Sequence, residues 1–112
     1  MPRAIGRNPA MEAILTGEPM SAERAYMLGL VNRLVDAGRA EDEAVALATA
    51  ITQNAPLAVW ESRKVVLASD SGDDETMWRL TDAALGKVMN SEDLKEGLAA
   101  FVEKRPPVWK GR

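Results

Sequence analysis

The sequence of 112 residues contains neither cysteine nor histidine. Without cysteine, the chain has no disulfide bond, thiolate metal site or cysteine nucleophile. Without histidine, it has no Ser-His-Asp triad, no histidine-ligated zinc ion and no acid/base catalysis by imidazole. Any chemistry within this chain would therefore rest on carboxylates, lysines, hydroxyls or backbone amides.

Long apolar segments and a strong charge of one sign are also missing. No apolar run approaches the roughly 20 residues that a membrane-spanning helix needs, and no signal-peptide pattern follows Met1. The 14 basic and 17 acidic residues give a net charge of −3, which favours neither nucleic acid nor an anionic membrane as a partner. No glycine-rich phosphate loop is present. We expect a cytoplasmic protein without a membrane or nucleic-acid partner.

The spacing of apolar residues predicts a mainly α-helical chain, with about six helices and at most one short strand. Capping residues, prolines and glycines place the helices at residues 8–16, 22–28, 40–54, 56–69, 73–89 and 91–104. Asn8 is the expected cap of the first helix. Residues 30–35 are β-rich at their ends and predict a short strand or an extended segment.

The fifth predicted helix carries a wide apolar surface. One strip of the fifth helix consists of Met77, Leu80, Ala84 and Val88, and the strip beside it consists of Trp78, Leu85 and Met89. A surface of this width in so small a chain indicates a missing partner. In the sixth helix, the residues spaced to face the core are Leu94, Leu98, Phe101 and Val102.

Acidic clusters at residues 41–43, 73–75 and 92–93 allow two interpretations. Paired carboxylates can catalyse acid/base chemistry, but each cluster lies at a predicted helix start, where negative charge stabilises the helix dipole. The second interpretation is favoured. The basic C-terminal tail around Trp109 is expected to be solvated. Binding of nucleic acid or of a phosphate-bearing small ligand is the alternative.

Three parts of the sequence together resemble the enoyl-CoA hydratase/isomerase (crotonase-like) family. The first combines an L-T-G turn, an S-A-E-R-A helix start and a G-L-V-N segment, at residues 10–17, 20–25 and 29–32. The second is A-P-L-A-V at residues 55–59 with Lys64. The third is the closing pattern E-G, then A-F-V-E-K-R-P, at residues 96–97 and 100–106. The resemblance covers nearly the whole chain.

The resemblance implies the C-terminal helical part of a crotonase-like fold, without the N-terminal ββα spiral. Residues 1–112 would form one helical unit, with residues 1–35 ending the core domain and residues 36–112 forming a trimerisation region. Residues 1–6 resemble the segment just downstream of the catalytic elements. No residue matches the family's catalytic glutamates or oxyanion glycine, so none is assigned as catalytic. Phe101 and Lys104 match positions that approach coenzyme A, although Phe101 also fits a core position.

We therefore expect part of an enzyme family that acts on acyl-CoA thioesters in fatty acid metabolism. The chain alone is expected to be inactive, to use no cofactor or metal and to bind acyl-CoA only weakly. Self-association as a dimer, trimer or higher form is expected. The alternative is a helical oligomerisation or interaction module without a ligand.

Overall fold

A computed structural model describes residues 2–112, and within that range the chain forms seven α-helices and no strand. The helices are α1 (Pro2–Ile5), α2 (Arg7–Thr16), α3 (Ala22–Met27), α4 (Ala40–Thr52), α5 (Pro56–Ala68), α6 (Asp74–Met89) and α7 (Glu92–Glu103). The mainly α-helical class is confirmed, and the short α1 is an addition to it. In the part of the chain that the structure describes, no helix is long and apolar enough to cross a membrane.

The chain divides into two units, one ending at Ala44 and the other beginning at Val45, so the boundary lies within α4. The expected division after residue 35 concerns assembly in a whole enzyme and stays a prediction. Three of the four buried apolar side chains of the described residues, Ile5, Ala10 and Ala25, belong to the first unit, and Ala100 belongs to the second. Each unit thus has a very small core of its own.

In the first unit, α1 packs against α2. The expectation that Asn8 caps α2 is wrong, because Gly6 occupies the cap position with φ 83° and Asn8 lies inside the helix. The Gly6 N–H donates to the Pro2 carbonyl at 3.0 Å and closes α1. The positive φ at this glycine lets α2 begin directly after that turn.

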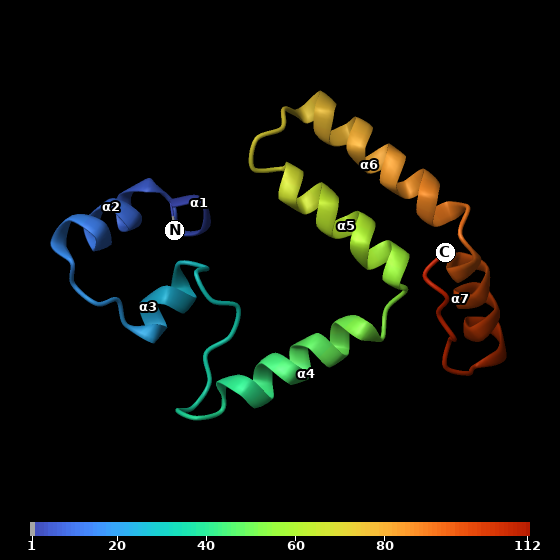
Figure 1. Ribbon diagram of the computed structural model, residues 1–112, viewed down its shortest axis with the longest axis horizontal. Coiled ribbons are helices and arrows are strands. Elements are labelled where there is room, and N and C mark those ends of the chain that lie inside the picture. The colour runs from blue at the N-terminus through green and yellow to red at the C-terminus, as the bar shows by residue number, and fades with distance from the viewer. Residues whose placement is uncertain (1) are drawn as a thin grey trace. The chain divides into compact units, whose positions relative to one another are not determined.

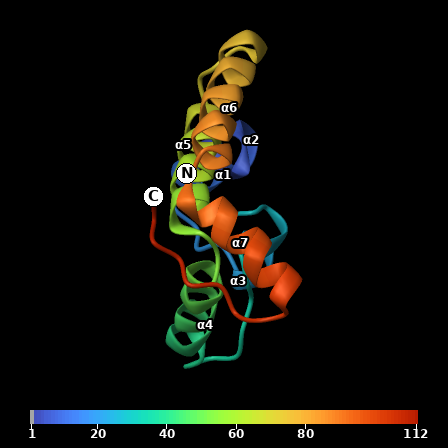
Figure 2. The same cartoon turned by 90° about the vertical axis from the view of Figure 1, so that its right-hand side faces the viewer.

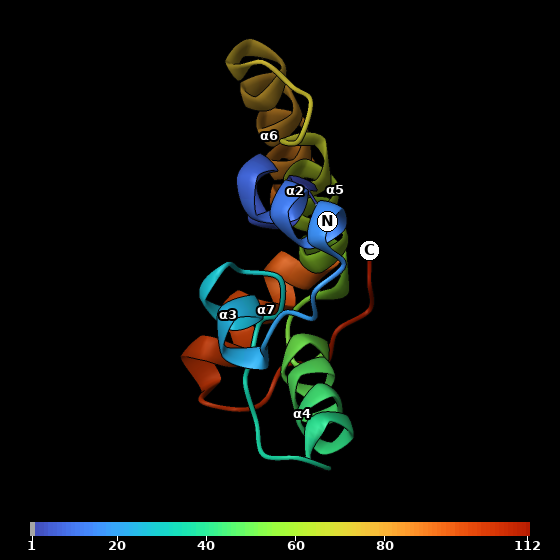
Figure 3. The same ribbon diagram turned by 90° about the vertical axis from the view of Figure 1, so that its left-hand side faces the viewer.

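The helix α3 begins as expected, with the Ser21 hydroxyl accepting a hydrogen bond from the Arg24 N–H at 3.2 Å. The Arg24 guanidinium holds Glu12 of α2 through two hydrogen bonds of 3.2 and 2.7 Å. Residues 30–35 form bends and irregular structure rather than a strand, and Figure 3 draws them as part of the loop between α3 and α4. No strand exists among residues 2–112 to pair with this segment, so its β-forming residues have no ladder to join.

In the second unit, α5 and α6 lie side by side as an antiparallel hairpin (Figure 1). The Asp73 carboxylate caps α6 by accepting from the Thr76 N–H at 2.8 Å. The first predicted strip of α6 is half-buried, whereas Trp78, Leu85 and Met89 of the second strip are 70%, 55% and 57% exposed. The two strips predicted from the sequence therefore differ in burial. The first faces α5, and the second is left uncovered on the neighbouring side of the helix.

The continuous helix expected over residues 91–104 is confirmed by α7, which has Ser91 as its N-cap and Lys104 as its C-cap. Its predicted core face is wrong for Leu98, Phe101 and Val102, which are exposed, whereas the fourth residue, Leu94, is half-buried. The buried side of α7 instead carries Asp93 and Ala100.

Close packing of the Trp109 ring explains why residue 97 is a glycine. A Cβ atom there would lie 3.3 Å from the Trp109 ring, which is closer than most carbon contacts. Gly97 thus lets the indole of the chain end approach the helix backbone. That approach helps to offset the roughly 1 kcal/mol by which glycine weakens a helix relative to alanine.

Candidate functional site

The end of α7 places the two residues that the sequence singled out, Phe101 and Lys104, in direct contact. Lys104 ends the helix in the left-handed conformation, with φ 54° and ψ 37°. The next N–H, that of Arg105, donates to the Ala100 carbonyl at 3.1 Å, which closes the helix end. This turn brings the Lys104 ammonium to 4.4 Å from the centre of the Phe101 ring.

That pair is open to solvent. The Phe101 side chain is 72% exposed, so the alternative in which it belongs to the core of this chain is wrong. A lysine ammonium over an aromatic face is an attractive cation–π contact. Together the two side chains present a positive charge and an apolar ring on one exposed helix end, a combination suited to an anionic ligand with an aromatic or apolar part.

The residues after Lys104 form a strap, residues 105–112, that turns back toward the start of α7 (Figure 2). The expectation of a solvated tail holds only in part, because Val108, Lys110 and Arg112 are exposed but the strap is also bound to the rest of the unit. The Trp109 indole N–H donates to the Gln53 carbonyl at 2.8 Å. Lys110 and Arg112 both pair with Glu92, at 2.9 and 3.2 Å. Because these cations already face a carboxylate, the strap offers no free basic patch to nucleic acid.

Glu96, the first residue of the closing E-G pattern, joins α7 to the beginning of the strap. Its two carboxylate oxygens accept from the Arg105 guanidinium at 2.5 and 3.1 Å, and one also accepts from the Val108 N–H at 2.8 Å. The Arg105 hydrogen bonds and then the Val108 N–H lower the pKa of Glu96 to about 2. The same ion pair, together with Glu103, raises the pKa of Arg105.

Asp93 holds the far end of the strap. Its carboxylate is 2% exposed and accepts from the Lys110 N–H at 2.6 Å and from the Gly111 N–H at 3.0 and 3.2 Å. In return, the Glu92 and Asp93 N–H groups donate to the Arg112 carbonyl at 2.7 and 3.2 Å. The acidic pair is therefore at a helix start, as expected, and also binds a segment that lies 17 to 18 residues away. No local pattern could reveal that second role.

A third carboxylate lies between α5 and α6. Glu61 is 6% exposed and pairs with Lys64 of its own helix and with Lys87 of α6 at 3.0 Å. The hydrogen bonds from Lys64 and then from Lys87 lower the pKa of Glu61. A carboxylate held in its charged form by two ammonium groups fixes a helix pair and is a poor proton acceptor.

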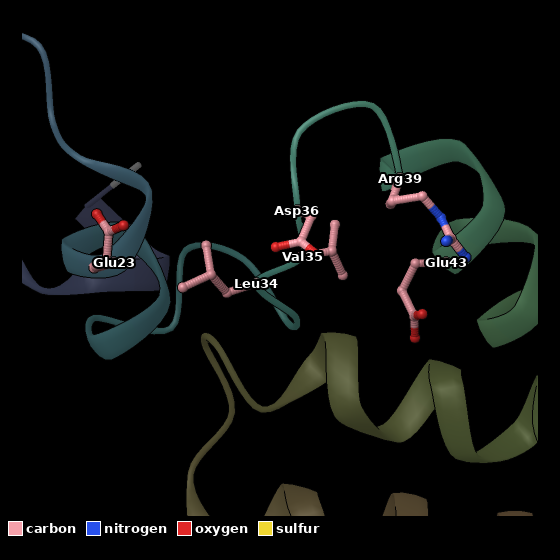
Figure 4. A pocket seen from close by; sticks show the side chains of 6 residues that line it. All are labelled: Glu23, Leu34, Val35, Asp36, Arg39 and Glu43. Atoms are coloured by element: carbon pink, nitrogen blue, oxygen red, sulfur yellow. The ribbon is translucent and has the colours of Figure 1, made fainter.

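Each unit also contains a surface groove or pocket. Glu61 forms part of the wall of an apolar groove of about 350 Å³ between α5 and α6. In the first unit, an open polar pocket of about 590 Å³ is lined by Glu23, Leu34, Val35, Asp36, Arg39 and Glu43 (Figure 4). Glu43 of that pocket pairs with Arg33. The pKa of Glu23 is lowered by its own backbone N–H and by Ser21.

The carboxylates offer little for acid/base catalysis. All those with a shifted pKa, namely Glu12, Glu23, Glu61, Asp73, Glu92 and Glu96, have it lowered. A general acid or base near neutral pH needs the opposite shift. Residues 2–112 also contain no cluster of three metal-ligating side chains. The three acidic clusters lie in or at the first turns of α4, α6 and α7, as the helix-dipole interpretation predicts.

Comparison with known proteins identifies the relatives of this helical arrangement. The sequence model of the enoyl-CoA hydratase/isomerase family matches residues 1–112. This chain belongs to the enoyl-CoA hydratase/isomerase family. The match extends over the whole sequence and includes the segments whose resemblance was noted above.

Solved structures of this family superpose closely on the chain. The enoyl-CoA hydratase of Mycobacterium tuberculosis H37Rv matches with a TM-score of 0.93 and 44% identity, over 100% of this chain and 44% of its own. The enoyl-CoA hydratase of Bacillus anthracis matches with a TM-score of 0.92 and 36% identity, over 99% and 43%. The fold corresponds to the helical C-terminal part of the crotonase fold.

Curated relatives in the same family give a consistent picture. The carnitinyl-CoA dehydratase of Salmonella paratyphi A is 37% identical over 116 residues, which span 100% of this chain and 44% of the relative. The chain thus spans less than half the length of the family relatives that it matches.

Proposed function

We propose that this chain serves in an enzyme acting on acyl-CoA thioesters in fatty acid metabolism, where it takes part in assembly and in holding the coenzyme A part of the substrate. The observation that carries the proposal is the exposed Lys104–Phe101 pair at the end of α7. Relatives named for enoyl-CoA and carnitinyl-CoA reactions support the substrate class. Coenzyme A enters as part of a substrate, so the proposal involves no cofactor.

The chemistry of coenzyme A suits this pair. Its phosphates are anionic, and a lysine ammonium on a flexible stem binds phosphate as a point charge. Among the described residues, no carboxylate forms an ion pair with Lys104, so its charge remains available to a ligand. Phe101 adds an apolar ring beside that charge. The contact is exposed and water-screened, which supports weak binding that depends on salt.

Bond making and breaking belong, in this proposal, to residues outside the matched region. The described carboxylates with shifted pKa values are held in their charged form by lysine, arginine or N–H donors. Removing a single oxyanion-hole donor from an enzyme typically lowers the rate by about 10²–10³-fold. Purified residues 1–112 should therefore not hydrate a short trans-2-enoyl-CoA above the uncatalysed rate. The measurement is the ultraviolet absorbance of the double bond conjugated to the thioester, which hydration removes. Turnover that disappears in Glu61→Gln would contradict this.

The ligand role of Lys104 requires a complete enzyme for its test. We would join residues 1–112 to the catalytic part of the M. tuberculosis relative and compare Lys104→Ala with the parent. Loss of an exposed charge contact should raise KM for acyl-CoA about two- to fivefold and leave kcat unchanged. The effect should shrink as salt is raised.

Lys95→Ala is the matched control for this experiment. Lys95 is an exposed lysine of the same helix, two turns before the pair. Its replacement removes the same net charge without touching the pair, so KM should stay at the parental value. Equal KM values for the parent and for Lys104→Ala would reduce Lys104 to a surface lysine.

A helical self-association module without a ligand is the second candidate. It is favoured by the uncovered strip of α6, with Trp78, Leu85 and Met89 all more than half exposed. The two candidates share the assembly role and differ at Lys104. A module without a ligand predicts no KM change for Lys104→Ala and normal assembly of that variant.

A further inference from the structure

The carboxylate of Glu96 binds the residues that directly follow the turn that carries Lys104. It holds the guanidinium of Arg105 with both oxygens, at 2.5 and 3.1 Å, and the N–H of Val108 at 2.8 Å. A bidentate carboxylate–guanidinium pair fixes orientation as well as distance. Glu96 lies in the middle of α7, so these bonds attach the first residues of the strap to the body of the helix.

The turn held in this way has an unfavourable backbone. Lys104 is the one residue other than glycine with a positive φ among residues 2–112. A left-handed conformation is disfavoured for any residue with a Cβ atom, and it persists where the surroundings over-determine it. The surroundings here are the Arg105 N–H, which donates to the Ala100 carbonyl, and the Arg105 guanidinium on Glu96.

The backbone of Lys104 also sets the direction of its side chain. With φ at 54°, the ammonium lies 4.4 Å from the centre of the Phe101 ring. If the turn relaxed to an ordinary helical or extended conformation, the side chain would leave the helix end in another direction. The position of the charge therefore depends on groups that do not touch it.

We propose that Glu96 is a positioning residue for the ligand charge of Lys104. By holding Arg105 and Val108, it fixes the left-handed turn and keeps the ammonium over Phe101 at the edge where acyl-CoA is bound. The geometric part concerns this chain alone. The ligand part rests on the function proposed above, and the experiment separates the two.

The geometric part is tested by NMR on the full chain. Ring currents shift protons above an aromatic face upfield, so the CεH₂ protons of Lys104 should be shifted upfield in the parent. Glu96→Ala should remove this shift, and Glu96→Gln, which keeps an acceptor for Val108, should reduce it. The control is Lys110→Ala, which loosens the far end of the strap at Glu92 and should preserve the shift.

Two results would overturn the geometric part: an unshifted Lys104 signal in the parent, or a shift that survives in Glu96→Ala. Arg105→Lys provides a second variant if Glu96→Ala does not fold. It keeps the positive charge but loses the planar fork, so the shift should fall as well.

The ligand part is tested by KM in the joined enzyme. Glu96→Ala should raise KM for acyl-CoA about two- to fivefold, as Lys104→Ala does, and the double variant should raise it no further. A fall in kcat at unchanged KM, or additive effects of the two changes, would show a purely structural role for Glu96. An unchanged KM in Lys104→Ala would instead refute the proposed function, while the NMR result decides the positioning independently.

Discussion

At the residue scale, Lys104 combines an unfavourable backbone with the proposed ligand charge. Glycine is the residue that most often ends a helix in the left-handed conformation, because it has no Cβ atom to clash with the carbonyl. Lysine in that position is less stable than glycine would be, because its Cβ atom disfavours the left-handed conformation. Such residues are often kept where a side chain is needed in one place.

The residue-scale prediction follows from that conflict. Lys104→Gly should raise the free energy of unfolding by about 1 kcal/mol, since the strain of the left-handed turn disappears. In the joined enzyme the same change should raise KM, since the charge is gone. Urea unfolding followed by helical circular dichroism measures the first effect. Lys104→Ala is the control, because it removes the charge but keeps the Cβ atom. A glycine variant no more stable than the alanine variant would contradict the prediction.

At the element scale, α7 and its strap behave as one structure tied together by carboxylates. Glu96, Asp93 and Glu92 hold successive parts of the strap, and Trp109 fits against Gly97. The hydrogen bonds at Glu96 come from the Arg105 guanidinium and the Val108 N–H, which bind a carboxylate better when it is ionised. Acid should therefore loosen the beginning of the strap.

The sign of the pH effect is set by the lowered pKa of Glu96, which falls from an ordinary 4.5 to about 2. Its contribution to stability is present above the ordinary pKa and is lost as the pH falls through the folded one. Between about pH 4.5 and pH 2, the free energy of unfolding should decline, and amide exchange at Val108 should accelerate. Arg105 faces this carboxylate most closely, with Lys110 at longer range.

Glu96→Gln checks that this decline belongs to Glu96. Glutamine cannot titrate, so the variant should start lower at neutral pH and fall less steeply over the same range. Glu92 also has a lowered pKa, caused first by Lys110, and should contribute its own decline in both proteins. Identical slopes for the parent and Glu96→Gln would contradict the assignment.

At the scale of the whole molecule, the second strip of α6 stays exposed, because no other described part of the chain covers it. Trp78, Leu85 and Met89 are exposed at helical spacing on one helix. Large exposed apolar patches on soluble proteins usually mark contact surfaces. We expect the chain to self-associate through this strip as a dimer, a trimer or a higher form.

Charge placed in this strip should weaken that association. Leu85→Glu should shift the sedimentation of the chain toward monomer at tens of micromolar, an order-of-magnitude concentration set by ordinary oligomer affinities. Ala83→Glu adds the same charge on an exposed position about 140° around the helix from Trp78 and should leave the sedimentation unchanged. A parent chain that sediments as a well-folded monomer at that concentration would argue against the surface.

Local chemistry in the sequence determined most of the helices. Ser21, Asp73 and Ser91 accept the cap hydrogen bonds at the starts of α3, α6 and α7, and Gly17 ends α2 with φ 68°. Caps and helix periodicity act between residues a few positions apart, so the sequence displays them directly. The two strips of α6 and the closeness of Phe101 and Lys104 were predictable for the same reason. The family, too, was readable from three short segments in the right order.

Tertiary structure alone decided which surfaces are buried and which charges meet. Leu98, Phe101 and Val102 have core spacing and yet are exposed, because the strap packs on the side of α7 that carries Asp93 and Ala100. The contacts of Glu61 with Lys87, of Asp93 with Gly111 and of Trp109 with Gln53 join residues 18 to 56 positions apart. Residues 30–35 have strand-forming side chains but gain no partner, and a strand exists only where another can pair with it. Burial and pairing depend on which segments pack against each other. Periodicity within one segment does not show which other segment will pack against it.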